Sequence, residues 1–218
     1  MSAAQGTVLL LIGSPKGLER SQSARLAKPV IGEMMASGWR CEEIHLQATM
    51  ASQSSIDGLL EAVGRSDTIL LSAPLYVDSL PAPVIDALRR IAEHRSAIAP
   101  AKVQRFAAIM NCGFVEPRHN DTCQFILQQF VQRARLEWVG GASVGCGGRM
   151  NRRVRKALEM MGRALADEVL VPEEVEKQTR KQVMPTWMYL LGGNAMWRSS
   201  AKANGVADQL RATPYERR

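Results

Sequence analysis

Leu10-Leu11-Ile12-Gly13-Ser14-Pro15-Lys16 is the stretch that decides the fold, and Ser21-Gln22-Ser23-Ala24-Arg25-Leu26 follows it closely. An apolar strand ends in a Gly-Ser-Pro-Lys loop, and a hydroxyl-rich turn then opens a helix. Unpaired backbone N–H groups and the helix dipole favour an anion at such a helix start. The serines add hydroxyl donors and Lys16 adds a positive charge, so the loop predicts an anion cradle.

The pattern of this loop also indicates the kind of anion. It matches neither the nucleotide P-loop, G-x-x-x-x-G-K-[ST], nor the dinucleotide pattern G-x-G-x-x-G. A cradle of hydroxyls and amides without these features suits a terminal phosphate monoester. The alternative is an ordinary strand-to-helix turn in which Ser21 only caps the helix.

Apolar runs alternate with helical patterns beyond this loop. Strands are expected at residues 7–12, 39–46, 68–72, 105–110 and 136–144. Helical spacing of apolar residues lies between successive strands. Pro29 falls inside the first helical pattern, about 22–37, which predicts a kink or a late start. The alternation predicts right-handed βαβ crossovers and an α/β fold with a doubly wound parallel sheet.

Composition excludes several classes of protein. The 218 residues are 46% hydrophobic, as in an ordinary globular chain, and no apolar run approaches the ~20 residues of a membrane span. The first residues lack the basic segment of a signal peptide, which predicts a cytoplasmic location. The four cysteines form no C-x-x-C pair and lie near no histidine cluster, so we expect free thiols and no metal site.

Charge divides the chain into two parts. Residues 1–148 hold 14 basic and 13 acidic residues, a net +1, whereas residues 149–218 hold 14 and 8, a net +6. The basic character therefore belongs to the tail, which argues against nucleic acid as the partner of the core. We expect two regions: an α/β domain at 1–148 and a basic helical extension at 149–218.

Three loops are expected to meet at the carboxyl edge of the sheet, where open α/β sheets bind ligands. They are residues 14–23, 74–78 and 111–114. The first suits a phosphate, the second offers a flat apolar wall, and the third offers Gly113, where a ligand can approach the backbone. The candidate binding residues are Ser14, Lys16, Ser21, Gln22, Ser23, Pro74, Leu75, Tyr76, Asn111, Cys112 and Gly113.

Two of these motifs resemble those of a known family. Gly13-Ser14-Pro15-Lys16 with Ser21-Gln22-Ser23 is similar to the FMN-phosphate loop of the flavodoxin-like NAD(P)H-dependent FMN reductases. Ala73-Pro74-Leu75-Tyr76, followed by Leu80-Pro81-Ala82-Pro83, resembles that family's loop beside the flavin ring. The resemblance covers about residues 7–148. It implies a five-stranded sheet of order 2-1-3-4-5, with FMN as cofactor and NAD(P)H as co-substrate.

The function implied by the resemblance is transfer of a hydride from NAD(P)H through FMN to a small-molecule electron acceptor, such as a quinone or a flavin. No side chain is assigned as catalytic, because the cofactor carries the chemistry. Two other functions stay open. One is a non-catalytic electron carrier of the flavodoxin type. The other is a flavin-free binding module with a basic tail.

The resemblance also implies a homodimer, with the helix that follows Pro81 and Pro83 as the contact. In the tail, Trp187, Leu190 and Trp197 recur at helical spacing. We expect this segment to pack against protein, with Trp187 and Leu190 buried. Binding to an anionic membrane surface is the alternative, since tryptophan and basic residues both suit an interface.

Overall fold

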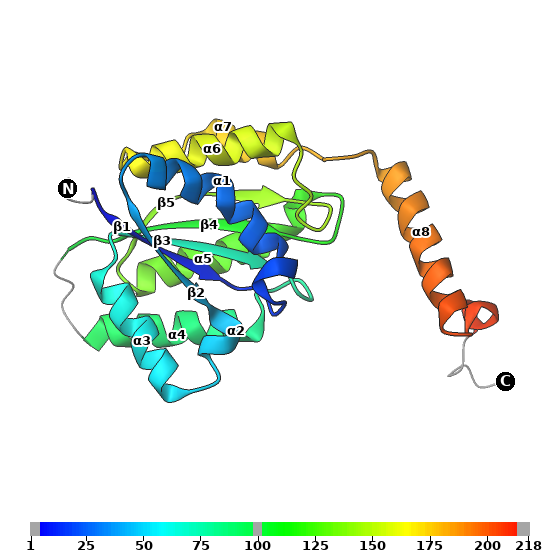
Figure 1. Ribbon diagram of the computed structural model, residues 1–218, viewed down its shortest axis with the longest axis horizontal. Coiled ribbons are helices and arrows are strands. Elements are labelled where there is room, and N and C mark those ends of the chain that lie inside the picture. The colour runs from blue at the N-terminus through cyan, green and yellow to red at the C-terminus, as the bar shows by residue number, and fades with distance from the viewer. Residues whose placement is uncertain (1–4, 98–101, 213–218) are drawn as a thin grey trace. The chain divides into compact units, whose positions relative to one another are not determined.

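A single parallel sheet forms the centre of the protein (Figure 1). The computed structural model describes residues 5–97 and 102–212. The strands are β1 (Thr7–Ile12), β2 (Arg40–His45), β3 (Thr68–Pro74), β4 (Arg105–Asn111) and β5 (Glu137–Val144). Their order is β2-β1-β3-β4-β5, and every pairing is parallel, so the predicted sheet and its order are confirmed.

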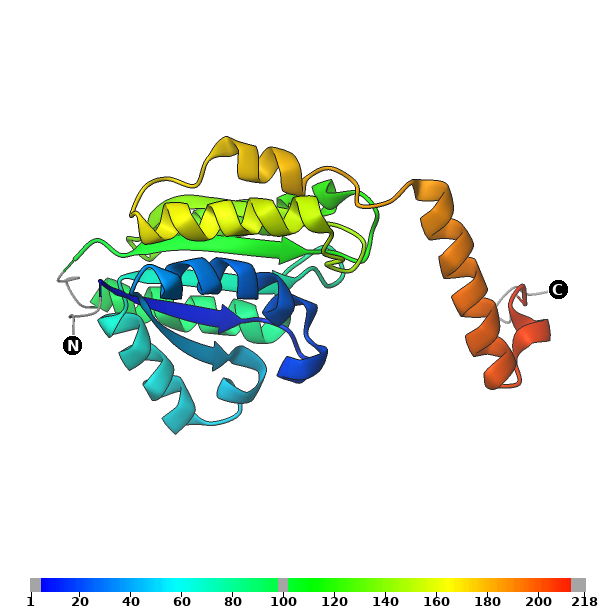
Figure 2. The ribbon, with the colours of Figure 1, turned by 45° about the horizontal axis from the view of Figure 1, so that its top comes forward.

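Helices cover both faces of the sheet (Figures 1 and 2). Helices α1 (Gln22–Ala36) and α6 (Arg152–Ala166) lie on one face, and α3 (Gln53–Arg65), α4 (Ala82–Ala97) and α5 (Asp121–Arg133) lie on the other. The central strands β1, β3 and β4 are buried on both faces and therefore contribute to two cores. One core includes Leu9, Leu71, Val84, Phe106 and Leu127. The other includes Leu10, Val30, Ile109, Met161 and Leu165.

The helix starts follow from local capping. The Ser21 hydroxyl accepts a hydrogen bond from the Ala24 N–H at 3.1 Å, as an N-cap does. Helix α1 begins directly after it and runs through Pro29, so the expected late start is wrong. Its buried face, with Leu26, Val30 and Met34, offsets the one hydrogen bond that the proline lacks. The short α2 (Leu46–Thr49) follows β2 directly.

Helix α6 belongs to the sheet rather than to the tail. Its apolar side covers the sheet beside α1, and α7 (Glu173–Thr179) packs against α6 and β5. One compact unit of the chain runs to Val183, and the second begins at Met184. The expected division at 148/149 thus separates α6 from the sheet that it covers.

The second unit contains α8 (Thr186–Ala203) and a short 3₁₀ helix, Ala207–Gln209. Trp187 and Leu190 are 66% and 55% exposed, so the second unit does not itself bury them, and their burial against protein stays a prediction. Within residues 5–97 and 102–212, none of the helices is both long and apolar enough to cross a bilayer.

Candidate functional site

A cavity of about 190 Å³ opens at the carboxyl edge of the sheet. It lies at the carboxyl ends of β1 and β3. From β1 the chain continues to β2 on one side of the sheet, and from β3 it continues to β4 on the other side, so this is the switch point of the strand order. Nine of the eleven candidate residues line it. The complete lining is Ser14, Lys16, Arg20, Gln22, Ser23, Pro74, Leu75, Tyr76, Asn111, Gly113 and Gly147.

The first loop leaves β1 through a position that only glycine fits. A Cβ atom on Gly13 would lie 2.6 Å from Val84 Cγ2 and 2.7 Å from Ala73 Cβ. The Gly13 N–H donates to the Ser72 carbonyl at 2.9 Å. His45, at the end of β2, forms a 2.7 Å hydrogen bond through Nε2 to the Ser14 carbonyl, so the edge strand also holds this loop.

The electrostatics of the first loop suit an anion. Lys16 and Arg20 line the cavity, and in the described part of the chain neither has a carboxylate partner. The amino terminus of α1 begins beside them, and its dipole adds to their positive potential. The Ser14 hydroxyl accepts from the Lys16 N–H at 3.2 Å, so its own hydrogen can point to a ligand.

Ser23 is fixed by buried hydrogen bonds from two strands. The Asn111 amide donates to the Ser23 hydroxyl at 2.9 Å and to the Ala73 carbonyl at 3.1 Å. The Ser72 hydroxyl donates to the Ser23 carbonyl at 2.8 Å. The Ser23 oxygen accepts the hydrogen bond from Asn111, which leaves the hydroxyl hydrogen of Ser23 available to donate. Ser23 lines the cavity, so a ligand there can accept this hydrogen bond. Asn111 therefore positions Ser23.

The second loop supplies an apolar wall. Pro74, Leu75 and Tyr76 line the cavity. The Leu75 N–H donates to the Asn111 carbonyl at 2.7 Å, and Tyr76 and Ser79 exchange backbone hydrogen bonds of 2.8 and 3.0 Å. Between these two, Val77 and Asp78 have φ values of 48° and 57°, the left-handed region that lets the turn reverse.

Two candidate residues do not line the cavity. Ser21 is fully buried and its hydroxyl caps α1. Cys112 is buried too, and its Sγ points to the carbonyls of Phe114 and Glu116, at 3.8 and 3.6 Å. Burial raises the pKa of the Cys112 thiol to about 11, so it stays protonated near neutral pH.

Sequence reasoning missed two lining residues, Arg20 and Gly147. Arg20 lies in an irregular insertion of the first loop, where spacing gives no guide to direction. Gly147 follows β5, and its N–H donates to the Cys112 carbonyl at 2.7 Å, which brings the fifth loop against the fourth. The run Gly145-Cys146-Gly147-Gly148 after a predicted strand is the signal that could have indicated it.

The arrangement can bind a ligand with an anionic end and a flat apolar part. Two cations, the α1 amino terminus and two serine hydroxyls gather at one end, and residues 74–76 form the wall at the other. Among the described residues that line the cavity there is no carboxylate, imidazole or thiol. The chemistry of the lining is compatible with FMN, and the site offers binding groups rather than an acid–base pair.

The sheet order and the cradle at its switch point define a flavodoxin-like α/β protein. No known protein-family profile matches the chain, and no curated protein matches it. Solved structures do. The fold is similar to that of an NAD(P)H:quinone oxidoreductase from Methanothermobacter marburgensis, with a TM-score of 0.57 and 15% identity, over 75% of this chain and 95% of that one.

Two further structures share the fold. An NADH:FMN oxidoreductase (EMOB) in its apo form matches with a TM-score of 0.59 and 15% identity, over 83% of this chain and 97% of that one. A WrbA-like flavodoxin from Agrobacterium tumefaciens matches with a TM-score of 0.58 and 13% identity, over 75% and 97%. The resemblance indicated by the sequence motifs is confirmed at the level of the fold.

Proposed function

We propose that this protein is an FMN-dependent oxidoreductase that passes a hydride from NAD(P)H through bound FMN to a small acceptor, such as a quinone or a flavin. The observation that carries the proposal is the pairing of the anion cradle with the apolar wall in one cavity. FMN has a phosphate monoester at one end and a planar ring at the other. The names of the similar structures, an NAD(P)H:quinone oxidoreductase and an NADH:FMN oxidoreductase, support the same class. A cytoplasmic location of the protein is consistent with NAD(P)H as the hydride donor.

The residues would divide the binding between them. Lys16, Arg20 and the hydroxyls of Ser14 and Ser23 would hold the phosphate, with the α1 dipole behind them. Tyr76 and its neighbours would cover one side of the ring and exclude water from it. Gly113 and Gly147 let the ring edge approach the backbone. When bound, FMN supplies the reversible hydride chemistry, so none of these side chains needs to transfer a proton.

Two other functions make different predictions. A flavodoxin-type carrier would bind FMN without oxidising NAD(P)H, and a flavin-free module would bind none. Carriers of that type are usually acidic, whereas this chain has a pI of about 9.6 and a net charge of +7. The charge therefore favours the oxidoreductase over the carrier.

The deciding experiment titrates FMN and FAD into the folded apo-protein and then measures oxidation of NADH and of NADPH with a quinone present. We expect FMN to bind in a 1:1 ratio and to support turnover. FAD should bind at least about tenfold more weakly, because the cradle suits a monoester rather than a diester. No binding of FMN would refute the proposal. Binding of FMN without oxidation of NAD(P)H would instead support the flavodoxin-type electron carrier.

Replacing Asn111 tests the internal support of the cradle. Asn111→Ala removes the bond that orients the Ser23 hydroxyl, and a lost hydrogen bond to a charged ligand is worth about 1.5 kcal/mol. We expect the affinity for FMN to fall about tenfold. The affinity for riboflavin, which lacks the phosphate, should change little.

Asn120→Ala is the matched control for this prediction. Asn120 is also fully buried at the carboxyl edge of the sheet, where its amide donates to the Val144 carbonyl at 3.4 Å, but it does not line the cavity. It should lower thermal stability without changing the ratio of FMN to riboflavin affinity. Equal losses for FMN and riboflavin in Asn111→Ala would contradict the positioning role.

A further inference from the structure

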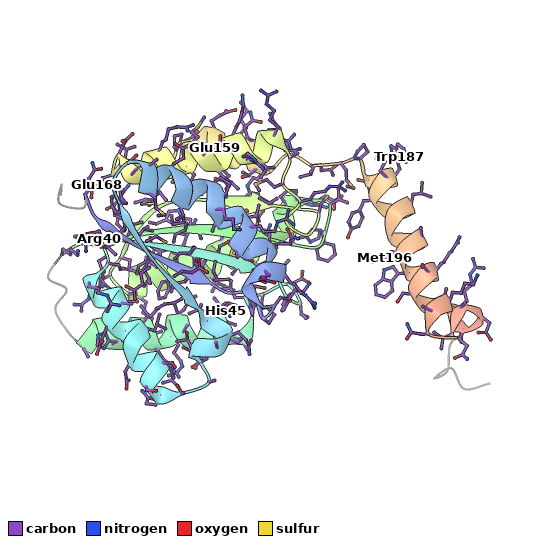
Figure 3. All side chains as sticks on the ribbon, in the orientation of Figure 1. Arg40, His45, Glu159, Glu168, Trp187 and Met196 are labelled. Atoms are coloured by element: carbon purple, nitrogen blue, oxygen red, sulfur yellow. The ribbon has the colours of Figure 1, made fainter. Side chains whose placement is uncertain are left out.

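Helix α8 exposes apolar side chains along most of its length. Trp187, Met196 and their neighbours project from it (Figure 3). The large apolar side chains that are between 47% and 66% exposed on this helix are Trp187, Met188, Leu190, Leu191, Met196 and Trp197. Globular chains rarely leave so much apolar surface in water, so we expect a partner to cover it.

These side chains lie on more than one side of α8. At 3.6 residues per turn, the two tryptophans and the two leucines fall within an arc of about 120°, whereas Met188 and Met196 lie outside that arc. A groove on a protein would cover the arc and leave both methionines in water. Lipid headgroups and acyl chains can surround the whole helix, so the distribution of apolar side chains favours a bilayer over a groove.

The uncharged segment of α8 is too short to cross a bilayer. Residues 184–197 contain no charged side chain, and their helical part, residues 186–197, is about 18 Å long. The hydrocarbon core of a bilayer is ~30 Å thick. Trp187 and Trp197 stand near the two ends of the segment, and tryptophan favours the boundary between headgroups and acyl chains. Such a helix can lie along that boundary in one leaflet.

Cations lie on both sides of this uncharged segment. Lys181 precedes it, Arg198 and Lys202 follow it, and all three are exposed. Within residues 5–97 and 102–212, none of the three forms an ion pair. Asp208 is the one acidic residue of residues 184–212. Because lysine and arginine near a bilayer attract anionic lipids, the charge of the tail favours an anionic surface.

A second group of cations, the basic patch, lies on the first compact unit. The patch consists of Arg25 and Lys28 on α1, Arg149 just before α6, and Arg152, Arg155 and Lys156 on α6. All of them are exposed, and none forms an ion pair in the part of the chain that the structure describes. Arg25, Lys28 and Arg155 line one surface hollow, in which Glu159 is the one carboxylate among the described residues. The patch is therefore strongly positive and open to a partner.

The chain leaves the first unit for α8 beside this patch. The Arg153 guanidinium, at the amino end of α6, donates through Nη2 to the carbonyls of Lys181 and Gln182, at 2.7 and 3.0 Å. Val183 packs against the core that α6 covers, and the second unit begins with the next residue. A bilayer is an extended anionic surface, so it can contact the basic patch and the nearby tail at once.

We propose that this protein binds the surface of an anionic bilayer. Helix α8 lies at the boundary between headgroups and acyl chains, and the cations of the tail and of the basic patch face lipid phosphates. The contact needs neither the flavin nor the proposed oxidoreductase activity. It takes the place of the packing against protein that helical spacing first suggests for α8.

Sedimentation of the full chain with vesicles tests the proposal. One set of vesicles contains equal parts of phosphatidylglycerol and phosphatidylcholine, and the other contains phosphatidylcholine alone. We expect at least about tenfold tighter binding to the anionic set, because the cations have no anionic lipid in the neutral set. Raising NaCl from about 0.05 M to about 0.5 M should weaken the binding, since salt screens the charges.

The apolar part of the contact is tested on α8 itself. Leu190→Asp places a carboxylate on the helix and should abolish sedimentation with the anionic vesicles. Phe125→Asp, at an exposed position of α5, is the matched control and should bind as the wild type does. Tryptophan emission should shift to the blue when vesicles are added, and Trp187→Phe combined with Trp197→Phe should remove the shift. Circular dichroism checks that each variant is folded.

The electrostatic part is tested by removing cations in pairs. Each lysine or arginine near an anionic bilayer contributes about fivefold to the affinity, so a pair contributes about 25-fold. Arg198→Gln combined with Lys202→Gln should therefore weaken binding by about that factor. Arg152→Gln combined with Lys156→Gln should do the same for the basic patch, although these residues do not line the flavin cavity.

Arg40→Gln combined with Arg133→Gln is the matched control, since it removes the same charge from exposed positions outside both regions. Wild type that stays in the supernatant, equal binding to neutral vesicles, or a cation pair that binds as this control does would each overturn the proposal. So would binding that Leu190→Asp leaves unchanged, since the cations would then bind a polyanion without α8. A blue shift that grows with protein concentration in the absence of vesicles would overturn it too, because a second copy of the chain would then cover α8.

Discussion

Gly162→Leu is expected to lose most of the stability of the first unit. Gly162 lies where α6 crosses α1, and a Cβ atom there would be 2.5 Å from the Val30 carbonyl oxygen and 3.0 Å from Val30 Cα. Backbone atoms cannot move aside as a flexible side chain can, so the two helices must separate. Overpacking of this kind typically costs about 1–3 kcal/mol, and a side chain as large as leucine should exceed that.

The control for Gly162→Leu is a glycine in the partner helix. Gly32 lies inside α1, but a Cβ atom there would meet no described residue within 4 Å beyond its own helix. Gly32→Ala should stabilise by about 0.5–1 kcal/mol, because alanine restricts the unfolded chain and favours helix. Urea denaturation measures both. A change in the urea midpoint for Gly162→Leu no larger than a few tenths of a molar unit, an order-of-magnitude bound for under 1 kcal/mol, would show that α1 and α6 do not pack this closely.

Ser14→Asp is expected to weaken FMN binding at least about a hundredfold. The new carboxylate would face the phosphate at the cavity, and two like charges about 4 Å apart near a protein surface repel by about 4 kcal/mol. The affinity for riboflavin should change much less, because it has no phosphate. Fluorescence titration of both flavins gives the two affinities, and a thermal melt confirms the fold.

Two further variants separate charge from position in this prediction. Ser14→Ala removes only a hydroxyl and should cost about tenfold in FMN affinity. Ser54→Asp adds the same charge on the exposed side of α3 and should cost almost nothing. An FMN affinity of Ser14→Asp equal to that of Ser54→Asp would place the phosphate somewhere else on the protein.

Much of the fold could be predicted because the central strands are apolar on both faces. The runs at residues 7–12 and 68–72 have no polar side that could face water, and the structure buries them in the middle of the sheet. The tail could not be predicted in the same way. Helical spacing of Trp187 and Leu190 identifies a helix, but it does not distinguish a face that packs within the chain from one that meets a partner.

The sequence predicted which loops form the site, but it predicted less well what each side chain does there. A serine at a helix start can bind a ligand or cap the helix, and Ser21 does the second. Asn111 lines the cavity as expected, and its amide also bonds to Ser23 and Ala73, a supporting contact that the sequence did not indicate. Such choices depend on which donor meets which acceptor across the sheet. That pairing is set by β4, β3 and α1 together, and no single segment of sequence contains it.

The two ends of the cavity have different freedom to vary. Buried hydrogen bonds between α1, β3 and β4 hold the anion end in place. Residues 76–79, by contrast, form a mostly exposed turn whose backbone hydrogen bonds lie within the turn. New sequences in this turn can therefore change the shape of the wall while the fastened end stays as it is. Under the proposed function, acceptor preference is then open to selection, or to loop exchange in the laboratory, while the proposed phosphate end of the cofactor site stays unchanged.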